Sequence, residues 1–299
     1  MAYKEIPDYT EEIVGFAIEQ FLATATFPDF RFSIEPFSRA QERLNGADGR
    51  LIDNIRFFKP FYMQFKRPFA YLEDSSSKIV KDRTRLGLTT SPRSLFFKLQ
   101  DKQPKHTDYQ HNLLFKLRED LRSSHEGDAA YVCPLFLHRE AYRQTLHLSA
   151  LQQLGRLPPW ILEDILIHRR SGGLSFSDIP TLREHISIPP HAPVTDAKHR
   201  YSFTEYGTEI CFHSPKAIEE GSRPLNKWLE PMYRDFKEKV GIISQDVAAK
   251  RLSILTEVLG LEMLYDLRSQ HGMRGWLLLG DYLKREYQIE QYAFIRWHE

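Results

Sequence analysis

The chain has 299 residues, of which 41% are hydrophobic and 27% charged, and its formal net charge at pH 7 is +1. This composition excludes a largely disordered chain, and no apolar run approaches a membrane span or the core of a signal peptide. Because Cys133 and Cys211 lie singly in apolar contexts without a CxxC spacing, we predict a cytoplasmic protein with neither a disulfide nor a zinc site.

The first half of the chain predicts an α/β fold. Residues 9–24 contain Thr10, which can cap a helix, and place most of their apolar residues on one face, which indicates an amphipathic helix. A second helix is expected at 107–124, and a buried strand at 128–137. Between the helices, strands are expected at 30–38, 49–57 and 59–72. The order helix, three strands, helix, strand favours a mixed central sheet flanked by helices.

The second half has a different texture. After about residue 145, short helical pieces alternate with Gly, Pro and Ser, and residues 199–214 resemble a hairpin. From Leu225 the pattern is mainly helical to about Arg268, and a mixed, aromatic segment follows. We therefore predict a core at 1–148 and a mainly helical accessory region at 149–299.

Lys66 stands in an aromatic stretch, FYMQFK, within the third expected strand. A lysine is rarely buried unless its charge has a partner. Because side chains alternate along a strand, Gln64 and Lys66 lie on the same face. Glu42 and Asp48 flank a Gly-containing turn earlier in the chain. Two carboxylates, a carboxamide and an ammonium could thus meet at one edge of the sheet.

These four groups suit the hydrolysis of a phosphodiester. Carboxylate and amide oxygens are ligands for Mg²⁺, and the metal polarises the phosphate and lowers the pKa of a bound water. A neighbouring lysine can orient that water and stabilise negative charge that develops on the phosphate.

The pattern E-x-x-x-G-A-D followed by F-Y-M-Q-F-K resembles the PD-(D/E)XK nuclease superfamily, and more narrowly its variants with Gln at the second motif position. Ala47 stands where the superfamily's name has proline. The resemblance covers about residues 9–137 and implies a restriction-endonuclease-like core. It implies that Asp48 is the metal-binding aspartate and Lys66 the catalytic lysine. The implied ligands of Mg²⁺, for which Mn²⁺ could substitute, are Glu42, Asp48 and Gln64.

Two further features follow from the resemblance. In other branches the acidic partner comes from the first helix, so that Glu12 ranks second to Glu42, and Glu11 and Glu19 are also available. Gln110, in the helix after the strand, resembles a glutamine that several families place beside the metal. The implied catalytic set is Glu42, Asp48, Gln64, Lys66 and Gln110.

Charge is unevenly distributed along the chain. Residues 56–118 hold 14 Lys and Arg against 5 Asp and Glu, whereas residues 1–55 hold 5 against 10. This distribution indicates either a cationic surface beside a carboxylate cluster or a solvated lysine-rich face. The resemblance to the nucleases implies DNA as the partner of such a surface. The expected phosphate contacts are Arg67, Arg83, Arg85, Arg93, Lys102 and Lys105.

The sequence therefore predicts a Mg²⁺-dependent endonuclease that cuts DNA, with bacterial, including antiviral, defence against foreign DNA as its setting. The alternative is a catalytically inactive subunit of the same fold that binds nucleic acid or acts as a scaffold in a complex. The aromatic segment near the C-terminus predicts that residues 225–299 mediate homo-oligomerisation or dock a partner subunit. Its rings would otherwise pack in the core.

Overall fold

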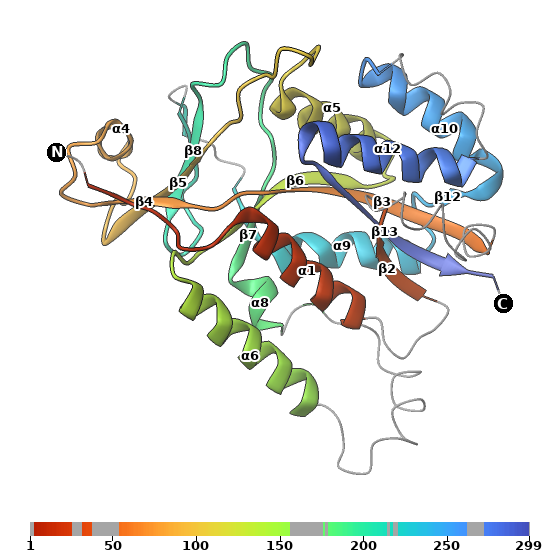
Figure 1. Cartoon of the computed structure of the whole chain (residues 1–299), viewed down its shortest axis with the longest axis horizontal. Helices are drawn as coiled ribbons and strands as arrows, with labels where there is room; N and C mark the ends of the chain where they lie inside the picture. The colour runs from red at the N-terminus through yellow and green to blue at the C-terminus, as the bar shows by residue number, and fades with distance from the viewer. Residues whose placement is uncertain are drawn as a thin grey trace.

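The protein is described by a computed structural model that forms a mixed α/β fold with two sheets flanked by helices (Figure 1). The residues that the structure describes are 3–25, 32–37, 54–155, 176, 179–213, 216–217, 221–261 and 272–298. Within these ranges, no helix is both long and apolar enough to cross a membrane.

The larger sheet has seven strands and one parallel pair. Its order is β11 (Arg223–Pro224), β7 (His185–Ile188), β6 (Asp128–Pro134), β3 (Ile55–Phe65), β13 (Glu290–Trp297) and β2 (Phe32–Pro36), and β12 (Ile243–Ser244) also pairs with β3. The strands β3 and β6 run parallel, and helix α5 (Gln110–Ser123) lies in the connection between them. The other described pairs of this sheet are antiparallel.

The strand β3 is central because both of its faces are apolar. Phe58 and Tyr62 pack on one side of the sheet and Phe57 and Phe61 on the other. Aromatic residues favour strands, and burial on both faces is typical of a strand inside a sheet. The sequence predicts two strands here, at 49–57 and 59–72, with a break at residue 58. The observed strand continues through that break and ends at Phe65, so both expected strands overlap it.

The smaller sheet is antiparallel in all its described pairs. Its order is β1 (Lys4–Glu5), β4 (Phe69–Leu72), β5 (Arg93–Lys98), β8 (Arg200–Thr204), β9 (Cys211–Phe212) and β10 (Lys216–Ala217). Helix α4 (Lys78–Arg85), which the sequence reading did not include, connects β4 to β5. The expected hairpin at 199–214 is confirmed, because β8 pairs with β9 and Gly207 adopts a φ of +73° between them.

Helices cover the two faces of the larger sheet (Figure 1). One face packs against α5, α10 (Gln245–Val258) and α12 (Gly272–Tyr287). The other face packs against α1 (Glu11–Ala25), α8 (Pro180–Arg183) and α9 (Leu225–Lys237). Helix α6 (Arg139–Gly155) lies beside α8.

The aromatic C-terminal segment forms part of the core. Strand β13 pairs with both β2 and β3, and the side chains of Trp276, Tyr292 and Phe294 have no exposed surface. Both sheets also take strands from both sides of residue 148, so the two predicted parts of the chain share their sheets. A docking role for residues 225–299 stays a prediction, but these rings already have intramolecular partners.

Two buried histidines predict that the folded protein loses stability at acidic pH. Burial lowers the pKa of His111 and of His185 to about 4, from an ordinary value of 6.5. Between these values the unfolded chain binds more protons than the folded one, so the stabilisation is complete above pH 6.5 and is lost as the pH falls toward 4. We expect the free energy of unfolding to fall by about 3 kcal/mol per histidine over this window, as measured by urea unfolding at several pH values.

Substitution separates this effect from other titrations. The His111→Gln and His185→Gln variants should lose less stability between pH 6.5 and 4 than the wild type. His147 is exposed on α6, so His147→Gln should keep the wild-type slope. The same slope in all four proteins would contradict the prediction.

Candidate functional site

Lys66 is buried at the carboxyl end of β3. Its backbone N–H donates to the Val132 carbonyl at 2.8 Å. This hydrogen bond continues the pairing with β6 for one residue beyond the end of β3. Only 5% of the residue is exposed. Its Nζ donates to Gln110 Oε1 at 3.4 Å and lies 6.0 Å from the centre of the Tyr131 ring. Burial lowers the pKa of Lys66, and the Glu11 carboxylate partly opposes that shift.

Gln110 joins this lysine to the C-terminal helix. It is the first residue of α5 and is 4% exposed. Its Oε1 accepts the hydrogen bond from Lys66, while its Nε2 donates to the Tyr287 carbonyl at the end of α12. Lys66 and Gln110 are therefore close to each other. The Gln110 carboxamide links Lys66 to the end of α12, which lies more than 200 residues later in the chain.

Gln64 is the least satisfied polar group near this end of the strand. It lies two residues before Lys66 and is fully buried. Neither its Oε1 nor its Nε2 has a hydrogen-bond partner in the part of the chain that the structure describes. Leaving a buried polar group unpaired costs about 1–3 kcal/mol, so such a group in a native protein calls for a functional explanation.

Glu11 is the acidic residue whose charge acts on Lys66 among the described residues. Its Oε1 accepts a hydrogen bond from the backbone N–H of Arg67 at 3.4 Å, and its charge acts on the pKa of Lys66. Glu12, which ranked ahead of it, instead has a lowered pKa because of a hydrogen bond with Thr10. Helix α1 thus places Glu11 at the end of β3, and the charge of Arg67 also acts on Glu12.

The two carboxylates that ranked first, Glu42 and Asp48, lie outside the described residues. Within the described residues, no group of three or more His, Cys, Asp or Glu side chains is arranged to hold a metal. The oxygen donors beside Lys66, the Glu11 carboxylate and the Gln64 amide, are of the type that Mg²⁺ prefers. These donors fit the cation in kind.

Arg83 has a structural role instead of the predicted contact with a phosphate. It is fully buried, and its Nη1 donates to Ser202 Oγ at 3.2 Å and to the Glu209 carbonyl at 2.8 Å. Its Nε and Nη2 both donate to the Thr89 carbonyl. The guanidinium therefore ties α4 to the β8–β9 hairpin and is closed to a nucleic acid.

The other predicted phosphate contacts differ in availability. Arg93 forms ion pairs with Glu5 and Glu205, and Lys105 forms one with Glu286. Arg67 donates to the Tyr9 carbonyl at 3.2 Å.

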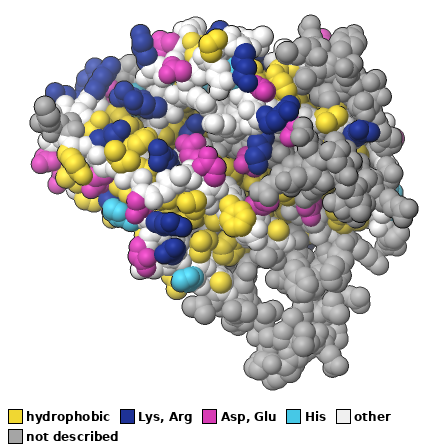
Figure 2. Space-filling view, in the orientation of Figure 1, with side chains coloured by type: hydrophobic (Ala, Val, Ile, Leu, Met, Phe, Trp, Pro, Cys, Tyr) yellow, Lys and Arg dark blue, Asp and Glu magenta, His cyan; other side chains and the backbone are white. Residues whose placement is uncertain are grey.

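Arg85 and Lys102 are open to solvent. The side chain of Arg85 is 61% exposed and pairs only at the surface with Asp82, and Lys102 lies over the ring of Tyr109. Figure 2 shows Lys and Arg side chains interspersed with acidic ones over the part of the molecule that holds α4 and its neighbouring strands. Arg85 and Lys102 remain the best placed of the predicted contacts.

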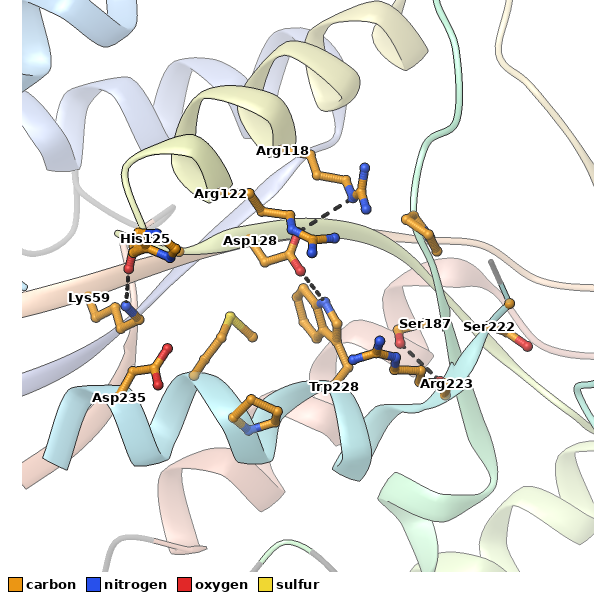
Figure 3. A pocket seen from close by; sticks show the side chains of 15 residues that line it. Lys59, Arg118, Arg122, His125, Asp128, Ser187, Ser222, Arg223, Trp228 and Asp235 are labelled. Carbon is orange, nitrogen blue, oxygen red and sulfur yellow. Dashed lines mark hydrogen bonds and ion pairs between the residues drawn. The ribbon is translucent and has the colours of Figure 1, made fainter. Parts of the chain in front are cut away.

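The structure also contains a cavity that the sequence reading missed. It has a volume of about 480 Å³ and lies at the other end of β3, between α5, β6 and α9 (Figure 3). The sequence feature that could have indicated this cavity is the pair Arg118 and Arg122. They lie one helical turn apart on α5, and residues at i and i+4 share a helix face.

The hydrogen bonds of Gln110 predict a measurable contribution to stability. We expect Gln110→Ala to lower the free energy of unfolding by about 1–3 kcal/mol, because it leaves the Lys66 ammonium and the Tyr287 carbonyl without their partner. Urea unfolding would measure the loss. Gln103→Ala, at a half-exposed position without a described side-chain hydrogen bond, is the matched control and should change little. Equal stability of the two variants would contradict this account of Gln110.

Compared with models of protein families, with curated proteins and with solved structures, the chain matches none of them. A functional proposal therefore depends on the chain's own side chains and on their geometry.

Proposed function

We propose that this protein is a metal-dependent nuclease that hydrolyses DNA phosphodiester bonds at the carboxyl end of β3. The observation that carries the proposal is the Lys66 ammonium, which is buried, bonded to Gln110 and influenced by Glu11. The parallel unit β3–α5–β6 supports it, since the carboxyl ends of parallel strands are a common place for binding and catalytic groups.

Each side chain has a distinct role in this proposal. Lys66 stabilises the negative charge that grows on the phosphate, and its low-dielectric surroundings strengthen that interaction. Gln110 positions Lys66 through its Oε1. Gln64, together with Asp48 and either Glu42 or Glu11, would supply oxygen ligands to Mg²⁺ or Mn²⁺. When bound, the cation polarises the phosphate and lowers the pKa of a water molecule.

The biological setting that we propose is bacterial defence against foreign DNA. It follows from the family resemblance of the G-A-D and Q-F-K stretches and is therefore an argument by analogy.

A specific observation favours a second candidate, a catalytically inactive subunit that binds nucleic acid or serves as a scaffold. Gln64 has no exposed surface and Lys66 has only 5%. A phosphate can reach these groups only if the protein around them opens. A subunit without activity would need no such opening.

The cleavage test compares Lys66 with an exposed lysine. With wild-type activity on plasmid DNA established in Mg²⁺ or Mn²⁺, Lys66→Met should lower the cleavage rate by about 100-fold or more, since it removes charge stabilisation in the transition state. The variant should stay folded, because replacing a buried charge with an apolar side chain of similar length removes a desolvation cost. Lys250→Met, at an exposed position of α10, is the control and should cleave normally.

Substitutions of the acidic residues complete this test. Asp48→Asn should abolish cleavage, and the larger loss between Glu11→Gln and Glu42→Gln would identify the second carboxylate. Folded Lys66→Met protein with wild-type activity would refute the assignment of Lys66. A wild type that binds DNA but cleaves none under these conditions would favour the inactive subunit.

Salt dependence tests the DNA contacts. The logarithm of the DNA association constant should fall linearly with the logarithm of salt concentration, because phosphate contacts release counterions. Arg85→Ala and Lys102→Ala should each make this slope shallower by about 0.9, as measured by fluorescence anisotropy. Lys250→Ala serves as the control. Wild-type slopes in both variants would remove Arg85 and Lys102 from the interface.

A further inference from the structure

The cavity of about 480 Å³ is remote from the proposed nuclease site. It is bounded by the last turn of α5, the start of β6, and parts of β7 and α9 (Figure 3). Lys59, on its wall, precedes Lys66 by seven positions, which corresponds to about 23 Å along an extended strand. The volume lies within the range of small-molecule sites, roughly 300–1,000 Å³.

Arginine side chains give this cavity its charge. Arg118 and Arg122 come from α5 and Arg223 from β11. Arg122 and Arg223 are exposed, and no ion pair or side-chain hydrogen bond is recorded for either of them within the described ranges. Figure 3 shows Arg118 and Arg122 on the α5 side of Asp128 and Arg223 beside Trp228. Guanidinium groups match the geometry of phosphate oxygens and can bind two of them at once.

The acidic residues of the cavity are already engaged. Asp128 accepts a hydrogen bond from the Trp228 indole N–H at 3.1 Å and lies 3.7 Å from Arg118 Nε. Burial raises the pKa of Asp128, and the charges of Arg118 and Arg122 partly oppose that shift. Burial lowers the pKa of Lys59, and the negative charge of Asp235 partly opposes that shift. Arg122 acts on Asp128 electrostatically, but its exposed guanidinium and that of Arg223 form no ion pair or side-chain hydrogen bond within the described residues, so both can attract an anion.

One part of the remaining wall is apolar and partly aromatic, and His125, Ser187 and Ser222 also line the cavity. The apolar part consists of Pro189, Trp228, Pro231 and Met232. Lys59 is unsuited to hold a ligand, because its Nζ already donates to the carbonyls of His125, Val240 and Gly241. A ligand that fits this cavity combines an anionic group for the arginines with a flat or apolar part for this wall.

We propose that the cavity binds a small phosphate monoester that carries a ring, of the class of the nucleoside monophosphates. Arg122 and Arg223 bind the phosphate, and the wall around Trp228 covers the ring. This site is independent of the nuclease function proposed for Lys66, because it shares no residue with it.

Isothermal titration calorimetry on the full chain tests the site, with adenosine 5′-monophosphate as the probe. We expect this probe to bind, and adenosine and inorganic phosphate to bind at least about tenfold more weakly, because each lacks one half of the ligand. Arg122→Ala and Arg223→Ala should each weaken binding about tenfold or more, since each removes a charge-assisted hydrogen bond.

Arg274→Ala, at an exposed arginine of α12 outside the cavity, is the matched control and should bind as the wild type does. Circular dichroism of each variant verifies folding, which exposed substitutions should preserve. No binding of the nucleotide at millimolar concentration, or wild-type affinity in both arginine variants, would overturn the proposal. Inorganic phosphate that binds as tightly as the nucleotide would overturn the assignment of a ring-bearing ligand.

Discussion

The parallel pairing of β3 with β6 is the interaction on which the rest of the molecule depends. It aligns Phe61 with Asp128 at one end and Phe65 with Val132 at the other, and the Lys66 N–H extends it. Because the two strands run in the same direction, α5 must cross the sheet between them. The same helix thus delivers Gln110 to one end of the pair and Arg118 and Arg122 to the other.

Two buried lysines, Lys59 on β3 and Lys66 directly after its end, differ in how their surroundings compensate their charges. Lys59 has its three donors directed at three backbone carbonyls, so its charge is compensated within the fold. Lys66 has one recorded hydrogen bond, to a neutral amide, and the unpaired Gln64 lies two residues before it. A fully compensated lysine serves the fold, whereas an incompletely compensated one is a candidate for work on a ligand.

The C-terminal segment extends this logic to the whole chain. Strand β13 lies between β2 and β3, and the end of α12 supplies the carbonyl that holds Gln110. Removal of the last residues would therefore open the sheet beside β3 and loosen the positioning of Lys66. The aromatic character of this segment reflects that burial, because Tyr292 stacks on Phe61 and Phe294 packs against Phe61 in a tilted arrangement.

Several local elements of this protein can be predicted from the pattern of neighbouring residues. Periodic apolar residues located α1 and α5, alternation located the β8–β9 hairpin, and strand period two placed Gln64 and Lys66 on one face. Such patterns are readable because they depend on neighbours within a few residues. Three features became visible only in the folded molecule. Strand β13 is part of the larger sheet, the charge of Glu11 acts on Lys66, and Arg83 is buried. Each of these features depends on contacts between distant parts of the chain. A local pattern of charge or hydrophobicity cannot predict which distant residue will compensate a buried polar or charged group.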